Sequence, residues 1–230
     1  MIRLTAFAVL LTVALNCPLL TAQDQKLVAN PAMNAMLESI RAKYELPGLS
    51  AAIVSQGQVT AIGAVGVRKI GSPEKLTIHD HVHIGSCTKA LTATMVARLI
   101  ESGKLDWKTT LGEALPDLKG TMDADFRGVT LAQLLTHRAG LPADGNWWML
   151  GKGTTTQQRR ALAKGILKEA PLHEPGTKYE YSNVGFTLAG LVAEQATSKS
   201  WEELMQKGLF EPLGMKTAGF GPPGAKGKVA

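Results

Sequence analysis

Apolar residues recur along this chain with two different spacings, and each spacing predicts a different kind of element. Helical spacing over residues 31–44 predicts a helix, which Pro47-Gly48 ends. The β-rich runs 49–54 and 59–67 are separated by a short polar turn and predict an antiparallel hairpin. A short extended segment is predicted over residues 79–84.

The stretch 88–102 is apolar on more than one face, which predicts a buried central helix that stops at Gly103. After it the pattern becomes helical throughout, with further helices predicted over 111–115, 131–137, 156–169, 184–197 and 201–209. This order predicts an α+β architecture. We expect a sheet hairpin and central helix over 31–104, followed by a helical subdomain over 105–220.

The beginning of the chain differs from the rest. Arg3 supplies a positive charge, an uncharged apolar run follows over 4–15, and the small residue Ala22 precedes a polar stretch. This layout is typical of a secretory signal peptide, and the run is short for a bilayer span. We expect a signal peptide over 1–22 and a partial domain over 23–230 that is secreted or periplasmic, with no stable membrane insertion after cleavage.

The cysteines and the charge of the chain exclude several kinds of anchoring, cross-linking and binding. Asn16 before Cys17 does not fit a lipoprotein signal, so lipoprotein anchoring at Cys17 is not expected. If Cys17 leaves with the signal peptide, Cys87 stays alone and no internal disulfide can form. The net charge is +6, but the basic residues are scattered, so we expect no nucleic-acid binding. The expected partner is a small-molecule or peptide substrate, with no cofactor.

Ser86 and Lys89 are the candidate nucleophile and its partner. A serine hydroxyl needs a nearby base, and residues three apart at the start of a helix share one face. The helix dipole and burial disfavour the charged ammonium, so a neutral lysine can take or relay the serine proton. The backbone N–H of Ser86 can help to hold an oxyanion. The pattern alone is not specific, because Ser72 and Lys75 repeat it in a turn-rich loop and a serine can simply cap a helix.

Tyr181-Ser182-Asn183 adds specificity to this pair. It follows a turn and precedes the helix predicted from residue 184. A tyrosinate beside a lysine ammonium can act as a general base, and an Asn side chain can hold both the lysine and a substrate amide. The alternative stays open that Tyr181 is a packed aromatic and that Asn183 is a helix N-cap.

With both elements in place, the chain resembles the β-lactamase-related serine hydrolases, which include class C β-lactamases, D-alanyl-D-alanine carboxypeptidases and related esterases. Ser86-Cys87-Thr88-Lys89 matches the first motif of this family and Tyr181-Ser182-Asn183 the second, and the similarity continues through the segments 134–141, 174–176, 179–185 and 212–215. The resemblance implies a serine β-lactamase/penicillin-binding-protein-like fold, with an antiparallel sheet and a helical subdomain. It also implies Ser86 as the acylated nucleophile, Lys89 as its partner, Tyr181 as the general base and Asn183 as a substrate-binding residue.

The third motif of this family, Lys-Thr-Gly or His-x-Gly on a strand near the C-terminus, has no match here. Lys216-Thr217-Ala218-Gly219 comes near, but it has an extra residue and follows 212–215, which lies in the helical region of the family. We therefore expect a C-terminally truncated chain, with its C-terminal strands missing and half of its oxyanion hole absent. Such a chain should expose apolar surface and associate through an exposed sheet edge.

Three functions follow from these observations. The first is a serine hydrolase that forms an acyl-enzyme on Ser86 with a β-lactam, a D-amino-acid peptide or a carboxylic ester. The second is a catalytically impaired fragment or pseudoenzyme that binds envelope peptides. The third is a metal-binding protein, because His79, His81 and His83 would share one face of a strand, although no further ligands complete that site.

The sequence gives less support for a functional role of the remaining polar and aromatic residues. His137 lies just beyond a predicted helix and is expected to be a structural histidine rather than a triad base. His173 has no assigned role. Trp147-Trp148 either lines a substrate cleft or packs internally.

Overall fold

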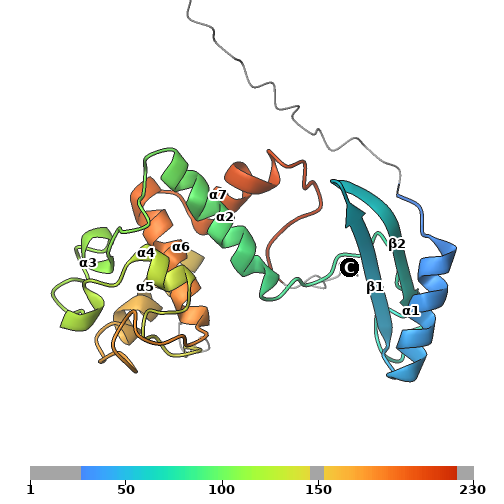
Figure 1. Ribbon diagram of the computed structural model, residues 1–230, viewed down its shortest axis with the longest axis horizontal. Coiled ribbons are helices and arrows are strands. Elements are labelled where there is room, and N and C mark those ends of the chain that lie inside the picture. The colour runs from blue at the N-terminus through green and yellow to red at the C-terminus, as the bar shows by residue number, and fades with distance from the viewer. Residues whose placement is uncertain (1–26, 146–152, 222–230) are drawn as a thin grey trace, which may run out of the picture. The chain divides into compact units, whose positions relative to one another are not determined.

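The computed structural model describes residues 27–145 and 153–221, which form two compact units (Figure 1). One unit ends at Asp80 and the other begins at His81. The predicted signal peptide, Cys17 and Trp147-Trp148 lie outside the described residues.

The first unit is a helix on a two-stranded antiparallel sheet. It contains α1 (Pro31–Lys43), β1 (Gly48–Ser55) and β2 (Gln58–Gly66). Helix α1 begins where it does because the Asn30 side chain accepts the N–H of Met33 and a proline occupies the first turn. It lies along the hairpin and buries Met33 and Leu37 (Figure 1). The predicted helix and hairpin are therefore confirmed.

A tight turn sets the register of the hairpin. Gln56 and Gly57 have φ angles of 49° and 75°, the left-handed pair that matches the twist of two antiparallel strands. The pairing then runs from Ser55 opposite Gln58 to Gly48 opposite Gly66, with one irregularity between Ile53 and Val54.

The second unit is helical, and long connections join several of its helices. Its elements are α2 (Cys87–Glu101), α3 (Leu111–Ala114), η1 (Ala124–Phe126), α4 (Leu131–Leu135), α5 (Thr155–Ile166), α6 (Asn183–Thr197), α7 (Trp201–Met205) and η3 (Gln206–Phe210). Helix α6 is buried over most of its surface, and α2, α3, α4, α5 and α7 pack against it (Figure 1). The core of this unit therefore lies around α6.

The predicted and observed elements differ at several places. The structure groups α2 with the helical unit, whereas the sequence-based division placed it with the hairpin, because α2 packs on α6, α7 and η3. The helix predicted over 201–209 is divided, since a π-helical turn replaces its second half from Gln206. Residues 79–84, where a short extended segment is predicted, form no strand.

Two further observations concern the described residues only. None of their helices is both long and apolar enough to cross a membrane. They also hold no group of three His, Cys, Asp or Glu side chains placed to bind a metal ion. His79, His81 and His83 do not lie on a strand, which is the element that the metal-binding alternative assumed for them.

Candidate active site

Ser86 occupies the N-cap position of α2, but its side chain does not cap the helix. Its backbone is right-handed helical, with φ −70° and ψ −7°, and its hydroxyl makes no capping hydrogen bond. By contrast, the N-cap residues Thr110 and Thr130 accept backbone N–H groups through their hydroxyls. The interpretation of Ser86 as a simple capping serine is therefore wrong, and its hydroxyl is available to other side chains.

Those other side chains are Lys89 and Tyr181. The Ser86 Oγ lies 2.8 Å from the Tyr181 hydroxyl oxygen and accepts a hydrogen bond from Lys89 Nζ at 3.3 Å. Lys89 is one helical turn after Ser86, as the spacing predicted. The structure thus brings the three residues predicted as catalytic into direct contact, although Tyr181 is 95 positions from Ser86 along the chain.

Lys89 is the centre of this cluster. Besides Ser86, its Nζ donates to Asn183 Oδ1 at 2.5 Å. The same nitrogen lies 4.7 Å from the ring centroid of Tyr181 and 5.6 Å from that of Phe186, within the range of a cation–π interaction. Two oxygens and two aromatic rings therefore fix the position of the ammonium group.

Tyr181 has the electrostatic surroundings that a general base needs. The pKa of its phenol is held below the usual value, first by the interaction with Lys89 and then by the hydrogen bond with Ser86, while the charge of Asp144 acts in the opposite direction. The Tyr181 side chain also remains partly exposed, at 38%. It is therefore not simply a packed aromatic, because its hydroxyl faces the candidate nucleophile.

Asn183 is the first residue of α6 rather than its cap. The Ser182 hydroxyl caps the helix by accepting the N–H of Gly185, so the predicted alternative of Asn183 as an N-cap is wrong. The Asn183 amide instead bridges two groups, since its Oδ1 accepts from Lys89 and its Nδ2 donates to Asp144 Oδ1 at 2.6 Å. The Asp144 carboxylate therefore determines which end of the amide faces the lysine.

The loop before Asp144 also holds the start of α6 through its backbone. The Ser182 hydroxyl donates to the C=O of Pro142 at 2.6 Å, and the N–H of Asn183 donates to the C=O of Ala143 at 2.7 Å. Sequence reasoning missed Asp144, because nothing in its immediate neighbourhood distinguishes it from a surface carboxylate.

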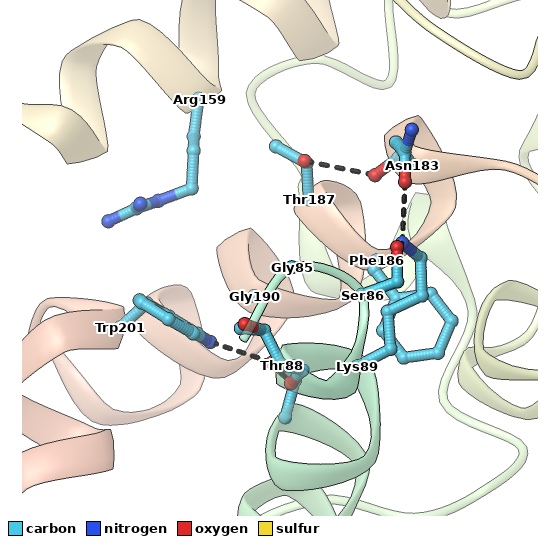
Figure 2. A pocket seen from close by; sticks show the side chains of 11 residues that line it. Gly85, Ser86, Thr88, Lys89, Arg159, Asn183, Phe186, Thr187, Gly190 and Trp201 are labelled. Carbon is cyan, nitrogen blue, oxygen red and sulfur yellow. Dashed lines mark hydrogen bonds between the residues drawn. The ribbon is translucent and has the colours of Figure 1, made fainter. Parts of the chain in front are cut away.

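A cavity of about 360 Å³ opens beside these residues. Figure 2 shows Ser86, Lys89 and Asn183 on one side of it and Arg159 and Trp201 on the other. Its lining residues come from α2, α5, α6, α7 and the turn before α2; they are Gly85, Ser86, Thr88, Lys89, Thr92, Arg159, Asn183, Phe186, Thr187, Gly190 and Trp201. No pattern in the sequence pointed to Arg159 and Trp201, which reach the cavity through the packing of α5 and α7 on α6.

The weaker candidates lie in different surroundings. Ser72 has no helix behind it and accepts the N–H of Glu74 at 3.4 Å within its own loop. Lys216-Thr217-Ala218-Gly219 lies in a turn and not on a strand. His173 Nδ1 lies 3.3 Å from the C=O of Glu174 and does not join the cluster.

The chain is similar to known proteins over most of its length. The profile of the Beta-lactamase family matches residues 33–229. Protein flp from Staphylococcus aureus strain MW2 is 26% identical over 199 residues, which are 85% of this chain and 39% of that protein. Penicillin-binding protein 4 from Amycolatopsis lactamdurans is 29% identical over 180 residues, which are 77% of this chain and 46% of that protein.

A solved structure shows the same similarity in three dimensions. D-alanine carboxypeptidase AmpC from Burkholderia cenocepacia superposes with a TM-score of 0.65 and 28% identity, over 79% of this chain and 47% of that one. The chain spans about two fifths of the length of the first curated relatives that it matches. Since the family profile extends over nearly the whole chain, from before the hairpin to beyond α7, the chain belongs to the Beta-lactamase family.

Proposed function

We propose that this protein is a serine hydrolase that forms an acyl-enzyme on Ser86 with an amide or ester substrate. One observation carries the proposal: the Ser86 hydroxyl does not cap its helix but lies 2.8 Å from the hydroxyl of Tyr181 and 3.3 Å from Lys89 Nζ. The substrate classes that suit this chemistry are β-lactams, D-amino-acid peptides and carboxylic esters. The solved structure of a D-alanine carboxypeptidase among the relatives supports the peptide class of this range.

In the proposed reaction, Tyr181 in its phenolate form accepts the proton of Ser86 while Oγ attacks the substrate carbonyl carbon. The tetrahedral intermediate collapses when the proton moves from Tyr181 to the leaving nitrogen or oxygen and the bond from that atom to the carbonyl carbon breaks. Water then attacks the acyl-enzyme by the same route and releases the acid. Lys89 supports both steps, because its ammonium stabilises the phenolate and holds Ser86 Oγ in place.

The developing oxyanion requires donors at the start of α2. The backbone N–H of Ser86 lies at this helix N-terminus, where the helix dipole favours negative charge. Asn183 Nδ2 carries a second hydrogen besides the one donated to Asp144, and we propose that it binds the substrate amide.

The leader-like pattern of residues 1–22 supports action outside the cytoplasm, and N-terminal sequencing of the exported protein would test cleavage after Ala22.

Hydrolysis of three substrates tests the proposal: a chromogenic cephalosporin, a D-alanyl-D-alanine peptide and a p-nitrophenyl ester. We expect turnover of at least one, and we expect Ser86→Ala to reduce that turnover to the uncatalysed rate, because no other serine or threonine hydroxyl in the described part of the chain has these partners. Ser72→Ala is the matched control, since it removes the serine of the other Ser-x-x-Lys pattern, and it should keep the parental rate. The proposal fails if folded protein hydrolyses none of the three, or if Ser86→Ala retains the activity.

A further inference from the structure

His137 contacts Tyr181 and both of its neighbours in the chain. Its ring stacks on the Tyr181 ring, with centroids 4.6 Å apart and planes inclined by 29°. Its Nδ1 accepts the N–H of Ser182 at 3.0 Å, and its backbone C=O accepts the N–H of Glu180 at 2.8 Å. His137 therefore contacts the ring of Tyr181, the candidate base, and also binds the backbone on both sides of Tyr181.

The backbone of His137 is itself unusual. Its φ angle is 58°, in the left-handed region that non-glycine residues seldom adopt. Such a conformation costs free energy and persists only where surrounding contacts impose it. Here the following residues are tied down as well, since the C=O of Arg138 accepts from Gly176 at 2.7 Å and the C=O of Gly140 accepts from Leu172 at 2.9 Å. The strained residue therefore lies in a well-fixed loop that faces the site.

The hydrogen bond from Ser182 sets the protonation of the ring. Nδ1 must offer its lone pair, so in the neutral ring the proton is on Nε2. The groups that face the imidazole are the rings of Tyr179, Tyr181 and Phe186. Burial, and then the nearby charge of Lys89, hold the pKa of His137 below its usual value, which keeps this acceptor available at neutral pH.

We propose that His137 is a positioning residue, which fixes Tyr181 against Ser86 by accepting the N–H of Ser182. This inference rests on the proposed function, in which Tyr181 is the base. Without the acceptor, a partly buried N–H loses its partner and the turn that carries Tyr181 loses a fixed point. A misplacement of about 1 Å at a reacting group can cost on the order of 100-fold in rate.

Two substitutions of His137 distinguish the effect of its side-chain acceptor from the effect of its left-handed backbone. Glycine and asparagine both tolerate a left-handed backbone, but only asparagine keeps an acceptor near the Ser182 N–H. We expect His137→Gly to lower the saturating rate constant for labelling of Ser86 by a fluorophosphonate on the order of 100-fold, with little change in the half-saturating concentration. His137→Asn should recover most of this loss. His79→Asn, at an exposed residue of the first unit, is the control and should label at the parental rate.

A second measurement does not depend on activity. The Tyr181 phenol is titrated by ultraviolet difference absorbance, with Tyr181→Phe subtracted to remove the other two tyrosines. We expect a midpoint below the ordinary value of about 10 in the parent and in His137→Asn, and a return to that ordinary value in His137→Gly. If the parent does not label but titrates in this way, the proposed function fails while the role of His137 stands.

Three results would overturn the inference. The first is a folded Gly variant that labels and titrates like the parent. The second is an Asn variant that loses as much as the Gly variant, because the acceptor would then not be what holds Tyr181. If circular dichroism shows that the Gly variant does not fold, the Asn variant carries the test, and the third result is an ordinary Tyr181 midpoint in that variant.

Discussion

At the scale of single residues, the hydrogen-bond partners of a serine hydroxyl distinguish a candidate nucleophile from a capping serine. The spacing of Ser86 and Lys89 was visible in the sequence, and the structure confirms that the two side chains meet. Asp144 and the contact of His137 with Ser182 were not visible, because both depend on how a loop returns to the start of α6. Short-range spacing predicts contacts within a helix, whereas contacts between distant loops need the fold.

The expected pH dependence of acylation also depends on single residues, Tyr181 and Lys89. Since the pKa of Tyr181 is lowered, its phenolate forms at a lower pH than that of free tyrosine, so the acylation rate should rise with pH around a midpoint below about 10. Lys89→Met removes the ammonium that is the main cause, so the midpoint should move upward toward about 10. The measurement is the second-order rate constant of labelling between about pH 5 and about pH 11.

Tyr44→Phe is the matched control for this pH profile. Tyr44 also lies beside a lysine, Lys43, with 5.2 Å from Nζ to the ring centroid, but it belongs to the first unit. Its substitution should leave the profile unchanged, and Tyr181→Phe should abolish the rise with pH. An unchanged midpoint in Lys89→Met would show that Lys89 does not set the ionisation of Tyr181.

At the scale of elements, helix starts were predicted better than helix ends. The starts of α4 and α5 carry capping boxes, in which Thr130 and Thr154 exchange hydrogen bonds with a glutamine three residues later. The end of α7 has no such local signal, and the π-helical turn from Gln206 reflects packing against α2, including a hydrogen bond from Arg98 to the C=O of Gly208. Local sequence therefore predicts capping, but not a change of helix type that packing imposes.

The junction of α5, α6 and α7 depends on Glu194, which is buried on an otherwise apolar face of α6. Its Oε1 accepts from Thr156 Oγ1 at 2.9 Å, from Arg159 Nη2 at 2.6 Å and from the backbone N–H of Trp201 at 2.7 Å. Glu194→Ala leaves Arg159 with Glu202 as its remaining acidic partner in the described structure. We expect the free energy of unfolding to fall by about 3–5 kcal/mol, as when one partner of a buried ion pair is removed.

Urea denaturation followed by circular dichroism measures this loss. Glu169→Ala is the control, because Glu169 is largely exposed and forms a salt bridge with its neighbour Lys168 at 3.3 Å. Surface pairs of this kind contribute little, so the control should unfold near the parental midpoint. Equal stability of the two variants would show that Glu194 does not hold the three helices together.

At the scale of the whole molecule, two short motifs and the similar segments around them predicted the family. Ser86 to Lys89 and Tyr181 to Asn183 led to the expectation of an α+β, β-lactamase-like fold, and both the family profile and the solved relatives confirm it. The division between the hairpin and the helices was harder to locate, because α2 is apolar on several faces and could pack on either unit. In the structure its partners are α6, α7 and η3.

The proposed acylation site combines residues that lie far apart in the sequence, from Ser86 to Asn183. The most direct measurement is the intact mass of the 230-residue protein after reaction with a penicillin or a fluorophosphonate, followed by peptide mapping of the adduct. We predict one adduct per chain, located on Ser86, absent in Ser86→Ala and retained in Ser72→Ala and Cys87→Ala. An adduct that persists in Ser86→Ala, or that maps to Cys87, would contradict Ser86 as the nucleophile.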